Sequence, residues 1–105
     1  MKKLTSALVI AATLISSSAY SATDVDICAS VQKFSASVMR HRQQGDSFSR
    51  MMKVVSASDH PEVKSKIIIS AFDRPRYGSE KYVRESISNF ANDMAVSCYK
   101  VRTSK

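Results

Sequence analysis

The two cysteines constrain this chain more than any other feature, because Cys28 and Cys98 are the only ones and stand near opposite ends of the chain beyond its N-terminal segment. A bond between them would close a loop of about 70 residues and, by chain entropy, stabilise the fold by about 4 kcal/mol. Small exported domains bury a modest core and often add such a covalent link. We therefore expect a disulfide between the two, with free thiols or pairing between chains as the alternatives.

The N-terminal residues have the layout of a secretory signal peptide. Two lysines follow the initiator methionine, then about a dozen mostly apolar residues, then a run of small residues. The apolar stretch is shorter than the roughly 20 residues that a membrane span needs. We expect residues 1–21 to be cleaved, with cleavage after Ala19 or Ala22 as alternatives, and residues 22–105 to form one periplasmic domain that does not span the membrane.

The rest of the chain has few interruptions and a helical apolar pattern. It contains only two glycines and two prolines, and between them apolar residues recur three and four positions apart. The last segment is the clearest, with an apolar face made of Val83, Ile87, Phe90, Met94, Cys98 and Val101. This pattern predicts four helices, over about residues 24–44, from Asp46 or Ser47 to about Ala57, 60–72 and 80–101.

Residues typical of helix ends support these boundaries. Thr23 or Asp24 suits the start of the first helix, and Gly45 suits the left-handed position after its end. The stretch 59–62, Asp-His-Pro-Glu, has a capping-box arrangement for the third helix, and Ser79 can cap the fourth. The predicted fold is all-α, a small four-helix array whose first and last helices are joined by the disulfide.

Enzymatic and metal chemistry find little support in the residue pattern. His41 and His60 fall on different predicted elements, so they lack the short spacing of metal ligands. No Gly-x-Ser-x-Gly sequence occurs, and a disulfide would leave no thiol nucleophile. We expect a protein that is not an enzyme and that holds no cofactor and no metal.

The net positive charge of the chain favours an anionic binding partner. The chain carries a formal net charge of +7, and loss of Lys2 and Lys3 with the signal peptide would leave +5. An exported protein seldom meets nucleic acid, so we expect no nucleic-acid partner. The expected counter-charge is an acidic periplasmic or envelope protein, or an anionic envelope surface of lipid or polymer. A surface whose charge only maintains solubility is the alternative.

The turn between the last two predicted helices is the main candidate for recognition. Pro75 ends one helix and Gly78 leads into the next, so a turn is needed there whatever its role. Arginine and tyrosine are nevertheless the side chains most enriched at interface hot spots. The candidate partner-binding residues are Asp73, Arg74, Arg76 and Tyr77, with Arg40 and Arg42 at the end of the first helix. Alternatively Arg74 or Arg76 pairs locally with Asp73 or Glu80, and Tyr77 packs over the disulfide end of the bundle.

Several short stretches carry a resemblance. They are Met39-Arg40 with Arg42-Gln43-x-Gly45, then Ile68-Ile69-x-Ala71-Phe72-x-x-Pro75-Arg76-Tyr77, with Cys28, Phe90 and Cys98 around them. Together they resemble a group of small, uncharacterised exported proteins of Gram-negative bacteria and their phages. The resemblance implies export, helices and the disulfide, and supplies no catalytic residue.

These expectations combine into one functional hypothesis. The chain is expected to be a non-enzymatic periplasmic module that binds an acidic protein through the 73–77 turn and nearby basic helix ends, as an inhibitor, immunity or exclusion-type factor. The alternatives are a binder of anionic envelope lipid or polymer, and an acid-stress chaperone.

Overall fold

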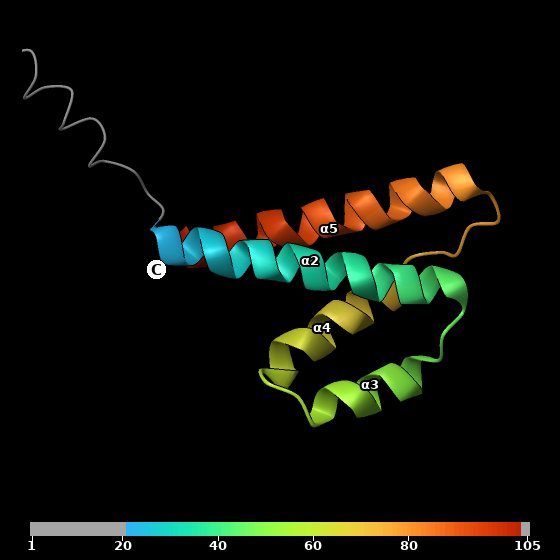
Figure 1. The fold of residues 1–105 in the computed structure, drawn as a ribbon, viewed down its shortest axis with the longest axis horizontal. Helices are drawn as coiled ribbons and strands as arrows, with labels where there is room; N and C mark the ends of the chain where they lie inside the picture. The colour runs from blue at the N-terminus through green and yellow to red at the C-terminus, as the bar shows by residue number, and fades with distance from the viewer. Residues whose placement is uncertain (1–20, 104–105) are drawn as a thin grey trace, which may run out of the picture.

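The computed structural model describes residues 21–103 and is all-α, so the expected signal peptide lies, except for Ser21, outside the described residues. Four helices lie in a row in the order α5, α2, α4, α3 (Figure 1). Their bounds are α2 Ala22–Gln44, α3 Phe48–Ser56, α4 Pro61–Phe72 and α5 Glu80–Thr103. The predicted four-helix array is therefore confirmed.

Helix α2 begins slightly earlier than the sequence suggested. Its N-cap is Ser21, whose Oγ accepts a hydrogen bond from the Asp24 backbone N–H at 3.1 Å. The Asp24 carboxylate in turn accepts from the Ser21 backbone N–H at 3.5 Å, which completes a capping box. The prediction of Thr23 or Asp24 as the cap was therefore wrong, because Asp24 acts from the third helical position instead.

Two small residues, Gly45 and Ser47, set the end of α2 and the start of α3. Gly45 adopts φ 89°, the left-handed conformation that glycine reaches without a Cβ clash, and its N–H donates to Arg42 O at 3.1 Å. Ser47 then caps α3, since its Oγ accepts from the Arg50 N–H at 3.3 Å. Gly45 as the stop is confirmed, and of the two caps proposed for α3 the structure selects Ser47.

Helix α4 begins without the capping box that residues 59–62 suggested. Its N-cap is His60, in the left-handed conformation with φ 52° and without a side-chain capping bond. The capping-box prediction was wrong because the chain turns at His60, one residue later, and Pro61 then fills the first helical position. Ser79 behaves as predicted at α5, where its Oγ accepts from the Tyr82 N–H at 3.3 Å.

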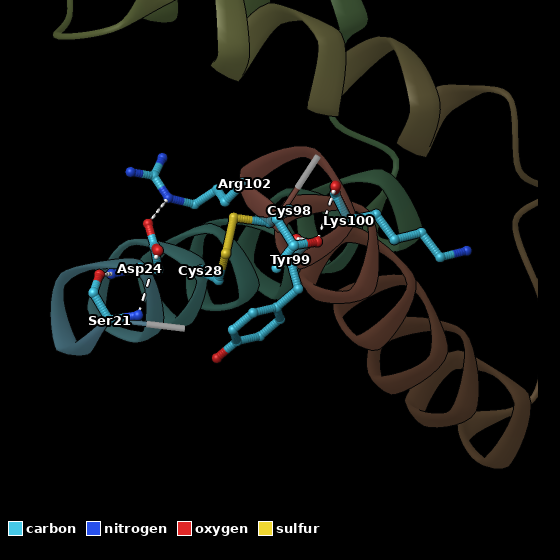
Figure 2. Close-up of a disulfide and its surroundings, with 8 residues drawn as sticks. Ser21, Asp24, Cys28, Cys98, Tyr99, Lys100 and Arg102 are labelled. Atoms are coloured by element: carbon cyan, nitrogen blue, oxygen red, sulfur yellow. Dashed lines mark hydrogen bonds and ion pairs between the residues drawn. A yellow bond between two sulfur atoms is a disulfide. The ribbon is translucent and has the colours of Figure 1, made fainter. Parts of the chain in front are cut away.

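Helices α2 and α5 pack closely along most of their length and share the most extensive helix–helix contact among the described residues. Both helices bury small residues, including Ser35 of α2 and Ala91 of α5. The Cys28–Cys98 disulfide joins the two helices near the start of α2 and the end of α5, with 5.6 Å between the Cα atoms (Figure 2). The predicted disulfide is confirmed, and it links the first helix to the last within one chain.

The core takes buried residues from α2, α3, α4 and α5, with α4 and α3 packing in turn beyond α2. It centres on fully buried Phe90, Met39 and Ile68, and each such side chain contributes about 1.5–3 kcal/mol by leaving water. Helix α4 packs against α2 and carries α3 on its outer side. Because α4 has little contact with α5, the array stays open between them. Val101, predicted to face inward, is instead 60% exposed at this opening.

Candidate functional site

The turn after α4 is held to the end of α2 by one buried side chain, Gln43. Its Oε1 accepts a hydrogen bond from the Tyr77 N–H at 2.9 Å, and its Nε2 donates to Pro75 O at 2.9 Å. The same Nε2 lies 3.4 Å from Ser86 Oγ on α5. Gln43 therefore fixes the turn and its distance from both long helices. Sequence reasoning gave this residue no role, although it lies within the Arg42-Gln43-x-Gly45 stretch.

Arg76 turns back onto the end of α2. Its Nε and Nη2 donate to Gln43 O at 3.4 and 3.3 Å. The guanidinium also covers Gly45 so closely that a Cβ at that position would lie 3.1 Å from Nη2. Arg76 thus caps the carbonyl end of α2, where a cation is favoured by the helix dipole.

Arg42 and Arg74 are also engaged within the fold. Arg42 donates through Nη2 to Arg74 O at 2.9 Å, and its guanidinium lies 5.0 Å from the Phe72 ring centroid. Arg74 donates to Asp93 Oδ2 at 2.9 Å and lies 4.8 Å from the centroid of Phe90. These contacts hold the turn against α2 and α5, so three of the four candidate arginines have a structural role.

The local alternatives for this turn were wrong in their partners. Arg74 pairs with Asp93 rather than with Asp73 or Glu80, because the turn runs along α5 towards its start, with Arg74 beside Asp93 and Tyr77 beside Tyr82. Tyr77 does not pack over the disulfide: it lies near the opposite end of α5, with its ring centroid 6.0 Å from that of Tyr82.

Three of the predicted partner-binding residues have exposed side chains outside the hydrogen bonds and ion pairs that hold the turn, and they lie on different parts of the fold. Tyr77 is 42% exposed, and Asp73 and Arg40 are also exposed. Arg40 belongs to α2, whereas Asp73 follows α4. The structure therefore engages Arg42, Arg74 and Arg76 in contacts within the fold and leaves Asp73 and Tyr77 exposed at this turn.

A larger recognition surface lies in the opening between α4 and α5. Two adjoining hollows, of about 480 and 390 Å³, share Ile27 and Val31 of α2, Val63 and Ile67 of α4, and Arg102 of α5. We call this continuous depression the α4–α5 groove. Its floor is α2 and its walls are α4 and α5. Ile27, Val63 and Val101 are 36%, 52% and 60% exposed there, so the groove presents apolar surface to solvent.

The charged residues that line the α4–α5 groove are all cations. Lys64 and Lys66 lie on the α4 side and Arg102 lies on the α5 side. No carboxylate belongs to the lining among residues 21–103. The groove therefore combines an apolar floor with a basic rim, a pattern that the sequence periodicity did not indicate because Val101 was expected to face inward.

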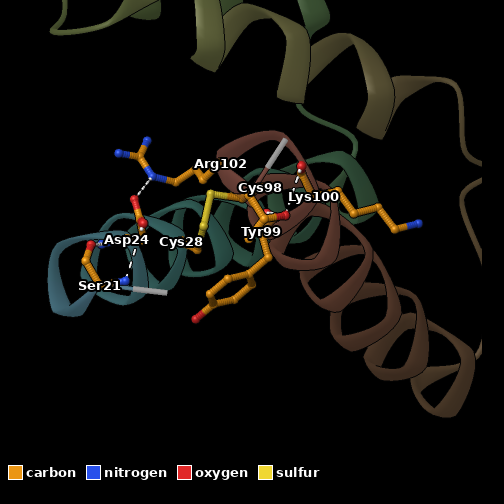
Figure 3. A network of polar contacts seen from close by, with 8 residues as sticks. Ser21, Asp24, Cys28, Cys98, Tyr99, Lys100 and Arg102 are labelled. Carbon is orange, nitrogen blue, oxygen red and sulfur yellow. Dashed lines mark hydrogen bonds and ion pairs between the residues drawn. A yellow bond between two sulfur atoms is a disulfide. The ribbon is translucent and has the colours of Figure 1, made fainter. Parts of the chain in front are cut away.

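One end of the groove is fixed by a polar network beside the disulfide. Arg102 forms an ion pair with Asp24, and Asp24 also holds the Ser21 cap (Figure 3). The hydrogen bond from Arg102 lowers the pKa of the Asp24 carboxyl below its ordinary value; desolvation opposes this, and the contacts with Ser21 reinforce it. The network thus links the end of α5 to the start of α2 by charge as well as by the covalent bond.

The described part of the chain gives little basis for other kinds of site. Across residues 21–103 no three His, Cys, Asp or Glu side chains gather as metal ligands would. None of the helices in that range is long and apolar enough to cross a bilayer. The disulfide itself is consistent with an oxidising compartment.

Comparisons with known proteins leave the family open. Searches against protein-family models, curated proteins and solved structures each gave no match. The resemblance to small exported proteins of Gram-negative bacteria and phages stays a prediction.

Proposed function

We propose that the protein is a non-enzymatic periplasmic binding module that takes an acidic amphipathic helix of a partner protein into the α4–α5 groove. The observation that carries this proposal is the groove itself, with exposed Val63 and Val101 between cations and without a lining carboxylate among the described residues. An inhibitor, immunity or exclusion-type role would use such a surface.

The shape of the opening favours a helix as the occupant. Two helices with a third beneath them form a trough, and amphipathic helices bind such grooves through apolar residues spaced three and four apart. The exposed apolar residues of the trough come from all three of its helices, α2, α4 and α5. A helix laid there would bury them much as a further helix of the array would.

Charge complementarity favours an acidic partner. Lys66 is exposed on the rim, and Arg102 keeps its guanidinium at the groove through its bond to Asp24. Carboxylates along the edges of a bound helix would meet these cations, which speeds association and discriminates against basic surfaces. The overall positive charge of the chain acts in the same direction.

In-cell crosslinking of the tagged, exported protein, followed by mass spectrometry, tests the proposal. Val63→Glu places a carboxylate in the groove, and Val96→Glu is the matched control, since Val96 is 51% exposed on α5 and does not line the groove. We expect a captured protein to be lost with Val63→Glu and kept with Val96→Glu. Equal capture by both variants would contradict the groove as the binding site.

A further variant separates the groove from the turn. Tyr77→Ser removes an exposed ring while leaving its backbone N–H bonded to Gln43. If the captured protein is lost with Tyr77→Ser and kept with Val63→Glu, the binding site is the 73–77 turn and not the groove. If wild type captures no protein, attachment to anionic envelope lipid or polymer becomes the better account, and that attachment should weaken as salt rises.

A further inference from the structure

A second hollow, on the other side of α4 from the groove, has the features of a small-molecule site. It measures about 410 Å³ and lies between α2, α3 and α4. Its inner surface is apolar, formed by Phe34 and Val38 of α2, Val55 of α3 and Ile68 of α4. Ligand pockets in proteins are commonly of this size and are lined mainly by apolar side chains with a few polar groups.

The packing of α3 explains why the pocket exists. Helix α3 is nine residues long and packs mainly against α4, so it leaves a space between itself and α2. Met51 and Val54 of α3 reach the wall of this space, and Val54 is 70% exposed. An apolar ligand body would cover surface that the fold leaves open to water.

The polar groups at the pocket favour an anion. His41 Nδ1 and Asp46 Oδ2 lie 2.5 Å apart and satisfy each other. Lys64 donates to Ser58 Oγ at 3.3 Å and has no carboxylate partner in the described chain, and Arg50 forms no ion pair there. Two cations from α3 and α4 therefore remain available to a negative head group.

We propose that this pocket binds a monoacyl anion, with its hydrocarbon chain against Phe34, Met51 and Val54 and its carboxylate or phosphate at Arg50 and Lys64. A small polar anion would leave the apolar lining exposed, whereas a neutral hydrocarbon would leave the two cations without a counter-charge. The guanidinium fork suits bidentate binding of either head group. The pocket lies on the other side of α4 from the α4–α5 groove; the two share Phe34 and Lys64 at their edges, and the pocket does not depend on the partner of the groove.

Calorimetric titration of the purified exported protein tests this, with myristate, tetradecyl phosphate and tetradecanol as probes below their aggregation concentrations. We expect both anions to bind and the alcohol to bind at least about tenfold more weakly, since a tenfold change is about 1.4 kcal/mol. Preference for one anion identifies a carboxylate or a phosphate head group. Equal binding of alcohol and anions, or no binding of either anion below about 0.1 mM, overturns the proposal.

Two variants with matched controls locate the ligand. Arg50→Gln with Lys64→Gln should weaken myristate at least about tenfold, while Lys53→Gln with Lys66→Gln removes the same charge outside the pocket and should not. Ser37→Phe, which fills the pocket from α2, should abolish binding with both cations intact. Binding that survives Ser37→Phe in a folded protein rules out the pocket. Val63→Glu should leave myristate binding unchanged, so this result is independent of the groove proposal.

Discussion

The side chain of Gln43 and the backbone of Tyr77 are joined across 34 residues of sequence by a hydrogen bond of 2.9 Å. Gln43 is 6% exposed, so this bond forms largely away from water. Because the same amide donates to Pro75 O, one glutamine fixes the turn that leads from the short helices into α5. The turn therefore has a structural role, and its arginines hold it against α2 and α5.

Replacing Gln43 with methionine should destabilise the fold by about 2–3 kcal/mol, because the Tyr77 N–H and the Pro75 carbonyl would lose their partner in a poorly solvated place. Urea unfolding followed by circular dichroism measures this. Gln44→Met is the matched control, since Gln44 is the exposed neighbour on the same helix and its substitution should change stability by less than about 0.5 kcal/mol. Equal effects at the two positions would mean that the turn is not held by the amide.

The two glycines should respond oppositely to alanine. Gly45→Ala should cost about 1–2 kcal/mol because its φ of 89° is unfavourable for a residue with a Cβ, which would also approach the Arg76 guanidinium at 3.1 Å. Gly78 has no atom within 4 Å of an added Cβ and no positive φ, so Gly78→Ala should be neutral or stabilise by up to about 1 kcal/mol. Thermal unfolding of the two variants provides the comparison. A stable Gly45→Ala protein would show that Arg76 moves aside and that the end of α2 can relax.

Much of the fold could be read from local sequence, because helix periods and end residues act over a few positions. Gly45 and Ser79 behave as predicted, and each helix begins and ends within about two residues of its expected bounds. The disulfide followed from the cysteine count and the expected export. Helix ends depend on residues close together in the chain, and the pairing of the only two cysteines can be predicted whatever their separation.

The missed features depend on residues far apart in sequence. Gln43 reaches Pro75 and Ser86, 32 and 43 positions away, and a polar residue near a helix end gives no local sign of such partners. The periodicity of α5 marked Val101 as apolar but could not show that α4 would leave it uncovered. The groove was missed for that reason: it exists where an expected helix contact is absent.

Loss of the disulfide should be the largest single destabilisation. Cys28→Ala with Cys98→Ala removes a link between residues 70 positions apart and should lower the free energy of unfolding by up to about 4 kcal/mol. Urea unfolding with and without reductant measures the effect. The double variant should be insensitive to the reductant, which makes it the control for other actions of the reagent. A wild type whose unfolding midpoint ignores reductant would mean that the α2–α5 packing alone sets stability.

The ion pair between Asp24 and Arg102 predicts a stability loss in acid. Because the pKa of Asp24 is lowered in the folded protein, its contribution is fully present above the ordinary aspartate pKa of about 4 and is lost as the pH falls through the lower folded value. Asp24→Asn should therefore be less stable than wild type at neutral pH, and the difference should shrink below about pH 4. Urea unfolding at a series of pH values measures that difference. Asp26→Asn is the matched control: Asp26 is exposed, two residues further along α2, and forms no ion pair within residues 21–103. A difference between wild type and Asp24→Asn that stays constant from neutral pH into strong acid would show that Asp24 stabilises the fold through its capping bond to Ser21 and not through its charge.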